Sequence, residues 1–98
     1  MNHKNQDRFI LNKIKGALEC GERVLDLSYD RIGDAGVIFL SRSANLAHVE
    51  ELNLSWNEFG DFGVQALAGC PSLVNLKILN LGSNQIGNAG AEALAKTP

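Results

Sequence analysis

Three stretches of the chain share one pattern: LDLSYDRIG at residues 25–33, LNLSWNEFG at 52–60 and LNLGSNQIG at 79–87. They start at Leu25, Leu52 and Leu79, so their spacing is constant, and each has leucines at its first and third positions. Aligning residues 52–71 with 79–98 gives ten identities in twenty positions. Self-similarity at a fixed period of this size is the signature of stacked repeats. The chain is therefore predicted to consist of similar units lying side by side.

Each unit is predicted to contain one strand and one helix. Leu52 and Leu54 alternate with polar residues, as Leu25 and Leu27 do, and this period of two indicates a strand with one buried face. A stretch of helical character follows each strand, so consecutive strands should run parallel. Inward-pointing helix residues are expected at equivalent positions of the three units, namely Leu40, Leu67 and Leu94.

Polar and glycine columns mark the turns of each unit. An amide side chain can both donate to and accept from the backbone of neighbouring turns, which is the role expected for Asn57 and Asn84. A carboxylate only accepts, so Asp30 should find fewer partners in that column and lie nearer to water. Two further columns are expected at the helix starts. The first should supply side-chain caps (Asp34, Asp61, Asn88), and the second should let each helix approach the sheet (Gly36, Gly63, Gly90).

The runs Val49-x-x-Leu52-x-Leu54-x-x-Asn57-x-Phe59 and Leu76-x-x-Leu79-x-Leu81-x-x-Asn84-x-Ile86 resemble the leucine-rich repeat family. The tail of each unit, such as Phe59-Gly-Asp-Phe-Gly, is similar to the ribonuclease-inhibitor-like branch with repeats of about 27 residues. The resemblance covers residues 22–98. It implies an α/β leucine-rich-repeat solenoid, a short arc with three parallel strands on the concave side and helices on the convex side.

The predicted domain organisation is an N-terminal capping helix over residues 1–23 and three leucine-rich repeats over 24–98. The repeats are bounded at 24–50, 51–77 and 78–98, the last being incomplete. Apolar residues of the cap recur at helical spacing (Phe9, Ile10, Ile14, Ala17, Leu18), and Gly21 should end its helix. A cap of this kind covers the open end of a solenoid.

The opposite end has no such cap in the sequence, so the third strand would be a bare edge. Three interpretations stay open: the chain is a fragment of a longer array, the uncapped C-terminal repeat forms a homodimer, or the bare end is tolerated.

Residues between the buried leucines are expected to face the concave side, where members of the resembling family commonly bind protein partners. The predicted partner-binding residues are Asp26, Ser28, Tyr29, Glu51, Asn53, Ser55, Trp56 and Asn80, with Val24, Ile78, Gly82 and Ser83 in the same columns. Tyr29 and Trp56 share a column and should be neighbours. Tyr and Trp are favoured at interfaces. The alternative interpretation makes them partly buried fillers and makes Asp26 and Glu51 part of an ordinary solvated face.

The composition argues against several other functions. A net charge of −2 over 98 residues is not that of a nucleic-acid binder, and no segment suits a membrane span or a secretory signal. Cys20 and Cys70 form no disulfide framework, and His3 and His48 have no ligand-like spacing, so we expect no metal and no cofactor. A cytoplasmic location is expected, although export by a route that needs no signal peptide would leave the same sequence.

The sequence thus predicts a non-enzymatic protein–protein interaction module. Alternatives are a recognition fragment of a larger effector or ubiquitin-ligase-type protein, a structural spacer, or a GTPase-activating repeat protein that places an arginine. Arg31 and Arg42 could serve in the last case, but neither occupies a repeated position.

Overall fold

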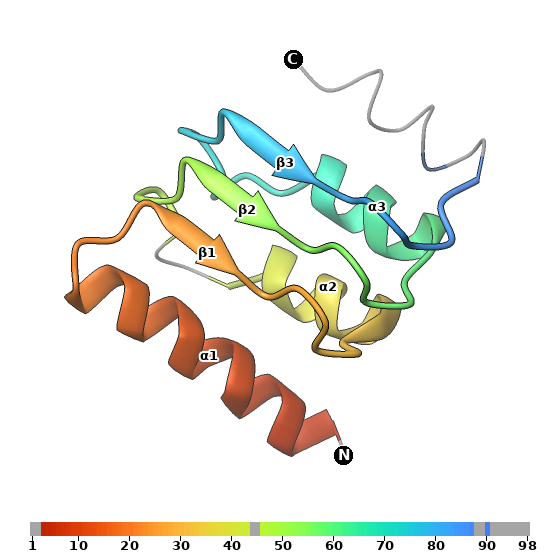
Figure 1. Ribbon diagram of the computed structural model, residues 1–98, viewed down its shortest axis with the longest axis horizontal. Coiled ribbons are helices and arrows are strands. Elements are labelled where there is room, and N and C mark those ends of the chain that lie inside the picture. The colour runs from red at the N-terminus through yellow and green to blue at the C-terminus, as the bar shows by residue number, and fades with distance from the viewer. Residues whose placement is uncertain (1–2, 44–45, 88–89, 91–98) are drawn as a thin grey trace.

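The computed structural model describes residues 3–43, 46–87 and 90. Its elements follow the order α1 (His3–Glu19), β1 (Val24–Asp26), α2 (Gly33–Ser41), β2 (Glu51–Asn53), α3 (Asp61–Ala68) and β3 (Ile78–Asn80). The three strands form one parallel sheet in the order β1-β2-β3. Helices α2 and α3 cover one face of the sheet, and α1 lies beside β1 at the sheet's edge (Figure 1). This is the short α/β arc that the sequence predicts.

The strands pair in the register of the repeat. Leu25 lies opposite Leu52, and Leu52 lies opposite Leu79, so each leucine faces its equivalent in the next unit. Parallel pairing continues past the short strands, because the backbone N–H of Tyr29 donates to Ser55 O at 3.1 Å and that of Trp56 donates to Gly82 O at 3.1 Å. Equivalent residues of successive units therefore lie side by side well beyond the strands themselves.

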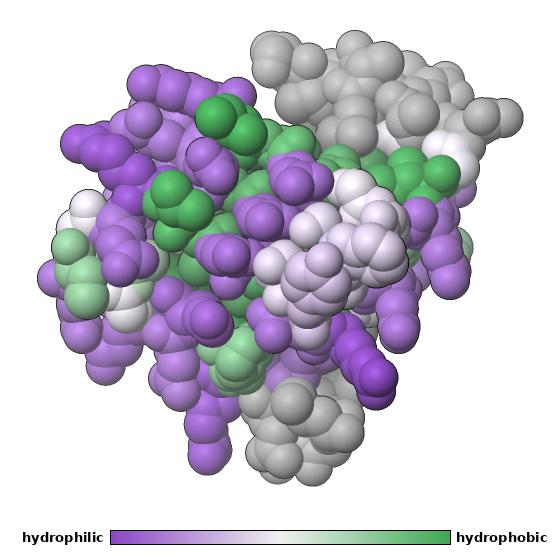
Figure 2. All heavy atoms as spheres, in the orientation of Figure 1, coloured by the Kyte–Doolittle hydropathy of each residue, from purple (hydrophilic) through white to green (hydrophobic). Residues whose placement is uncertain are grey.

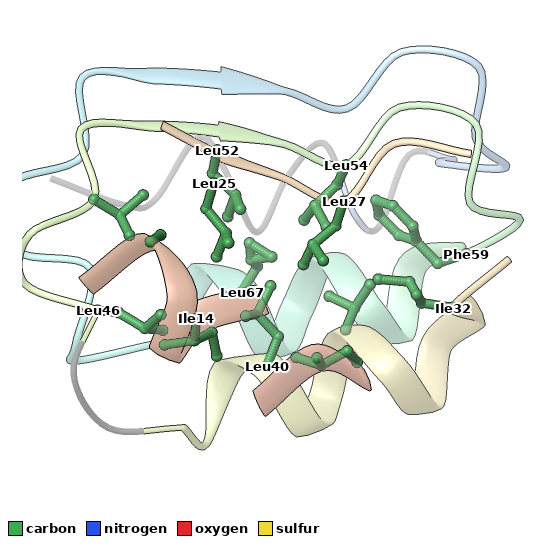
Figure 3. Close-up of a cluster of buried hydrophobic side chains, with 14 of the residues drawn as sticks. Ile14, Leu25, Leu27, Ile32, Leu40, Leu46, Leu52, Leu54, Phe59 and Leu67 are labelled. Carbon is green, nitrogen blue, oxygen red and sulfur yellow. The ribbon is translucent and has the colours of Figure 1, made fainter. Parts of the chain in front are cut away.

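The apolar core lies between the sheet and the helices. Leu25, Leu27, Leu52 and Leu54 point from the strands toward α2 and α3, where they meet Leu40 and Leu67 (Figure 3). The strand leucines of the first two units are at most 2% exposed. Their equivalents in the third unit, Leu79 and Leu81, are only partly buried. The core is thus densest in the first two units. Leu94, the third of the expected inward helix residues, lies outside the described residues.

Helix α1 closes the β1 side of this core. Ile10, Ile14 and Ala17 are buried among the core residues, as their helical spacing predicts. Leu18 shares this helical spacing but is 44% exposed. The helix ends at Glu19. Gly21 follows with a φ of 69°, and the N–H of Glu22 donates to Ala17 O at 2.9 Å. The domain boundaries at 23/24, 50/51 and 77/78 stay a prediction.

The predicted role of the helix-start aspartates is wrong. Neither α2 nor α3 has a side-chain cap from its own first turn. Asp34 Oδ1 instead accepts from the backbone N–H groups of Gly60 (2.8 Å) and Gly63 (3.0 Å), at the start of the next helix. Asp61 Oδ1 does the same with Gly87 (2.7 Å) and Gly90 (3.0 Å). Each carboxylate therefore caps the unit that follows it, because stacking brings that unit's orphan N–H groups within its reach. Asn88 lies outside the described residues.

The expected reason for the helix-start glycines also needs correction. A Cβ built on Gly63 would lie 3.0 Å from Asp34 Oδ1 and 3.2 Å from Val37 Cβ, both on the preceding helix. A Cβ on Gly90 would lie 2.7 Å from Asp61 Oδ1. At these two positions the close approach is to the preceding helix and its carboxylate rather than to the sheet. The glycine of one unit thus packs directly against the aspartate of the preceding unit.

Candidate functional site

The residues of the asparagine column bind successive units together just after the strands. Asn57 is fully buried; its Oδ1 accepts from Asp30 N at 2.9 Å and its Nδ2 donates to Leu27 O at 2.8 Å and Leu54 O at 3.0 Å. Asn84 repeats this pattern one unit later, accepting from Asn57 N at 2.8 Å. The predicted structural role of Asn57 and Asn84 therefore agrees with these contacts.

Asp30 is half-buried, and within the described residues its carboxylate makes no hydrogen bond of the kind that Asn57 makes. Burial raises the pKa of Asp30, while the charge of Lys13 acts in the opposite direction. These observations agree with the expectation that a carboxylate in this column finds fewer partners.

The turn on either side of this column holds non-glycine residues in the left-handed region. Tyr29 and Trp56 have φ of 62° and 61°, and Ser83, in the same column of the third unit, has φ of 57°. Arg31 and Glu58, two residues later, have φ of 52° and 62°. This conformation costs roughly 1–2 kcal/mol per residue for an L-amino acid.

Tyr29 and Trp56 stack on one another at the surface. Their ring centroids lie 5.6 Å apart with an interplanar angle of 10°. Tyr29 is 70% exposed and Trp56 is 53% exposed. Their predicted adjacency is confirmed, and their interpretation as partly buried fillers does not fit these exposures. Figure 2 shows pale, near-neutral spheres gathered just beyond the C-terminal ends of β1 and β2.

The column formed by Asp26, Asn53 and Asn80 is tied to the turn that leaves each strand. Asp26 Oδ1 accepts from the backbone N–H of Ser28 (2.9 Å) and from its hydroxyl (2.6 Å). Asn53 makes the same pair of bonds with Ser55, at 3.0 and 2.7 Å. Asn80 accepts from Gly82 N at 3.0 Å. The bonds from Ser28 lower the pKa of Asp26. Ser55 is buried and Ser28 is half-buried, so these two hydroxyls stabilise the turn and offer little contact to a partner.

The first row of the sheet face is amphipathic. Half-buried Glu51 lies between Val24, which is 45% exposed, and Ile78, which is 56% exposed. Two green patches on the sheet side of Figure 2 agree with exposed apolar side chains on this face. This row offers apolar contact on both sides of a carboxylate.

A charged column precedes that row and was missed in the sequence analysis. Glu50 pairs with Arg23 and, at 3.3 Å, with Lys77, which are its equivalents in the preceding and following units. The hydrogen bond from Arg23, followed by that from Lys77, lowers the pKa of Glu50. The alternation of sign at the repeat period is the signal that could have revealed this column. It leaves the two cations nearest the strand starts already paired.

Among residues 3–43, 46–87 and 90, no three His, Cys, Asp or Glu side chains gather as metal ligands. Cys20 and Cys70 are both unbridged, and the Cys70 thiol donates to Ser41 O at 3.2 Å. Both ring nitrogens of His48 are buried without a hydrogen-bond partner in the described part of the chain. No described helix combines the length and the apolar character needed to cross a bilayer.

A parallel sheet that gains one strand with each sequence repeat, with one helix per unit and a buried amide joining the turns, defines the class of leucine-rich-repeat solenoids. The family model described as Leucine Rich repeat matches residues 23–41, 45–68 and 72–95. These matches cover most of the chain, which therefore belongs to the leucine-rich-repeat family, in its ribonuclease-inhibitor type. Comparison with curated proteins and with solved structures gave no match. Members of this family are generally protein-interaction modules.

Proposed function

We propose that this chain is a non-enzymatic module that binds a protein partner on its sheet face, with the Tyr29–Trp56 stack as the anchor. One observation supports this proposal most strongly: two large aromatic side chains are exposed, stacked and held in left-handed turns. Membership of the leucine-rich-repeat family supports the same class of function.

Folding alone gives no reason for aromatic residues at these two positions. Ser83 holds the same backbone conformation in the third unit, so the turn does not require a ring there. Leaving rings exposed forgoes the ~1.5–3 kcal/mol that full burial of a large apolar side chain contributes. Tyr and Trp dominate the energetics of protein interfaces because they bring a large contact area at low entropic cost. A partner that covers the stack would recover the burial that the isolated chain lacks.

The proposal is tested first by locating the partner's contact. A photo-crosslinking residue at position 78, exposed on the sheet face, is compared with one at Gln65, which is exposed on α3. The partner identified at position 78 is then purified and titrated against the variants Trp56→Ser and Phe62→Ala. Serine is chosen because Ser83 already occupies this column. Phe62 is the matched control, since it is an aromatic residue that is 73% exposed on α3.

We expect Trp56→Ser to weaken partner binding at least about tenfold, the loss typical of a central aromatic anchor. Phe62→Ala should change the affinity less than about twofold, and both variants should keep the circular dichroism spectrum of the parent chain. A partner that crosslinks only at position 65, or that binds Trp56→Ser as tightly as the parent, would show the assignment to be wrong.

A further inference from the structure

The aromatic stack stops one unit short of the end of the sheet. Tyr29 covers one face of the Trp56 ring, and the two rings follow the direction in which the units stack. The other face of Trp56 is therefore turned toward the third unit. There the same column holds Ser83, preceded by Gly82, and both residues are exposed. A planar group could lie on Trp56 above these two small residues, in the place that a third ring would take.

The columns of the sheet face around this position hold carboxylates and no basic side chain. These four columns begin at residues 24, 26, 28 and 29 and contain two carboxylates, Asp26 and Glu51, with no Lys or Arg. Half-buried Asp30 adds a third carboxylate at the edge of this face. Beside the first row, Arg23 and Lys77 are both engaged with Glu50. Arg31 is exposed in the turn that follows these columns. On α1, Lys13 lies 5.6 Å from the centroid of Phe9 and acts on Asp26 and Asp30 from the edge of the sheet.

We propose that the partner segment recognised by this face is basic, and that one of its arginine side chains stacks on the outer face of Trp56 above Gly82 and Ser83. This inference rests on the proposed function, because it names the chemistry of the segment that the sheet face binds. A guanidinium is planar and only weakly hydrated, so it stacks on an indole ring more readily than an ammonium does. The carboxylates of the same face complement its charge.

The first row of the face fits the same chemistry. Glu51 lies between the exposed aliphatic side chains of Val24 and Ile78. A long basic side chain lays its methylene stem on apolar surface and keeps its charged end in a polar site. This row can therefore accept a second basic residue of the same segment. An acidic segment would instead face Asp26 and Glu51 without a compensating cation in these columns.

The test uses three nine-residue peptides built of Gly and Ser that differ only at three positions, which carry arginine, citrulline or glutamate. Citrulline keeps the planar shape of arginine and removes its charge. The fluorescence of Trp56 reports binding directly, because it is the single Trp of the chain. We expect saturable binding of the arginine peptide, at least about fivefold weaker binding of the citrulline peptide, and no binding of the glutamate peptide.

Two variants separate stacking from charge. Ser83→Tyr places a ring in the column where Tyr29 adopts a similar φ. The new ring should cover Trp56 and lower the affinity for the arginine peptide at least about fivefold. The double variant Asp26→Asn with Glu51→Gln should lower the affinity for the arginine peptide several-fold, and the remaining affinity should depend less steeply on salt concentration. Asp26→Asn preserves the turn, because Asn53 makes the same bonds to Ser55 that Asp26 makes to Ser28. Removing two exposed charges elsewhere, with Glu19→Gln and Glu22→Gln, is the control and should change the affinity less than about twofold.

The proposal is overturned if the arginine peptide fails to saturate, if the citrulline peptide binds equally well, or if Ser83→Tyr leaves the affinity unchanged. The proposed function fails separately. If the crosslinked partner needs Trp56 but contacts it through a neutral or acidic segment, the sheet face remains the binding site and only its preference for basic segments is wrong.

Discussion

Asn57 shows how much of the solenoid depends on single side chains. Its amide joins the backbone of its own unit to that of the preceding one and is completely buried. Asn57→Ala should lower the free energy of unfolding by about 3 kcal/mol or more, because each buried backbone group left without a partner costs roughly 1–3 kcal/mol. Asn84→Ala is the matched comparison and should cost less, since Asn84 is only half-buried. Urea denaturation of both variants measures the difference, and equal losses would contradict this account.

Asp30 occupies the same column with the less suitable side chain. Because burial raises the pKa of Asp30, the ionised form destabilises the folded state, and this penalty disappears as the pH falls through the raised pKa. Asp26 behaves in the opposite way: its pKa is lowered, so its stabilising contribution is lost as the pH falls through its folded-state pKa. Asp30→Asn should raise the free energy of unfolding at pH 7 by about 1 kcal/mol, since the new amide can donate to the backbone. The gain should shrink in acid; a gain that grew below pH 4 would refute the assignment.

Helices α2 and α3 are joined where a glycine of one meets a carboxylate of the other. Intrinsic helix propensity alone would favour Gly63→Ala by about 1 kcal/mol. We expect the reverse, a loss of about 1–3 kcal/mol, because the new methyl group would crowd Asp34 and Val37. Gly16→Ala is the control: it lies inside α1 with no atom within 4 Å of the added Cβ, and it should stabilise the chain by about 1 kcal/mol. Thermal unfolding of the two variants should therefore shift in opposite directions, and a gain from both would remove the crowding argument.

The elements that the sequence predicts well are those that depend on one unit at a time. The alternation of Leu52 and Leu54 indicates a strand whichever unit lies beside it, and the spacing of Ile10 and Ile14 indicates a helix. The role of Asp34 could not be found in this way, because a capping rule considers one helix alone. Its true partners are 26 and 29 residues away and become neighbours only when the units stack.

Some features of the candidate site could also be predicted from the sequence, and others could not. Adjacency of Tyr29 and Trp56 follows from their separation by one repeat and was predictable. Their left-handed backbone was not, because β-period alternation places a side chain on a face but says nothing about the turn after the strand. Ser55 illustrates the limit: alternation assigns it to the concave face, whereas its bonds to Asn53 hold it in the turn, where it is buried.

At the scale of the whole molecule, stability depends on how the units and α1 share one core. In a solenoid the total stability is approximately the sum of the units and of the interfaces between neighbours. The third unit contributes little within the described residues, since Leu79 and Leu81 are only partly buried. The interface of α1 with β1 and α2 should therefore provide a large share.

The variant Ile10→Ala tests whether the stability of the sheet face depends on the packing of α1. Ile10 on α1 is completely buried, so Ile10→Ala should cost about 2–5 kcal/mol. Because α1 and the repeats share one core, the far-ultraviolet signal of the helices and the fluorescence of Trp56 should shift to the same lower denaturant midpoint. Leu11→Ala on the same helix is the control; Leu11 is 49% exposed. Its truncation should cost about 0.5 kcal/mol or less, as is usual at the surface. If Trp56 instead kept its parental midpoint while helical signal was lost, α1 would be an independent attachment, and the sheet face that carries the aromatic stack would be stable without it.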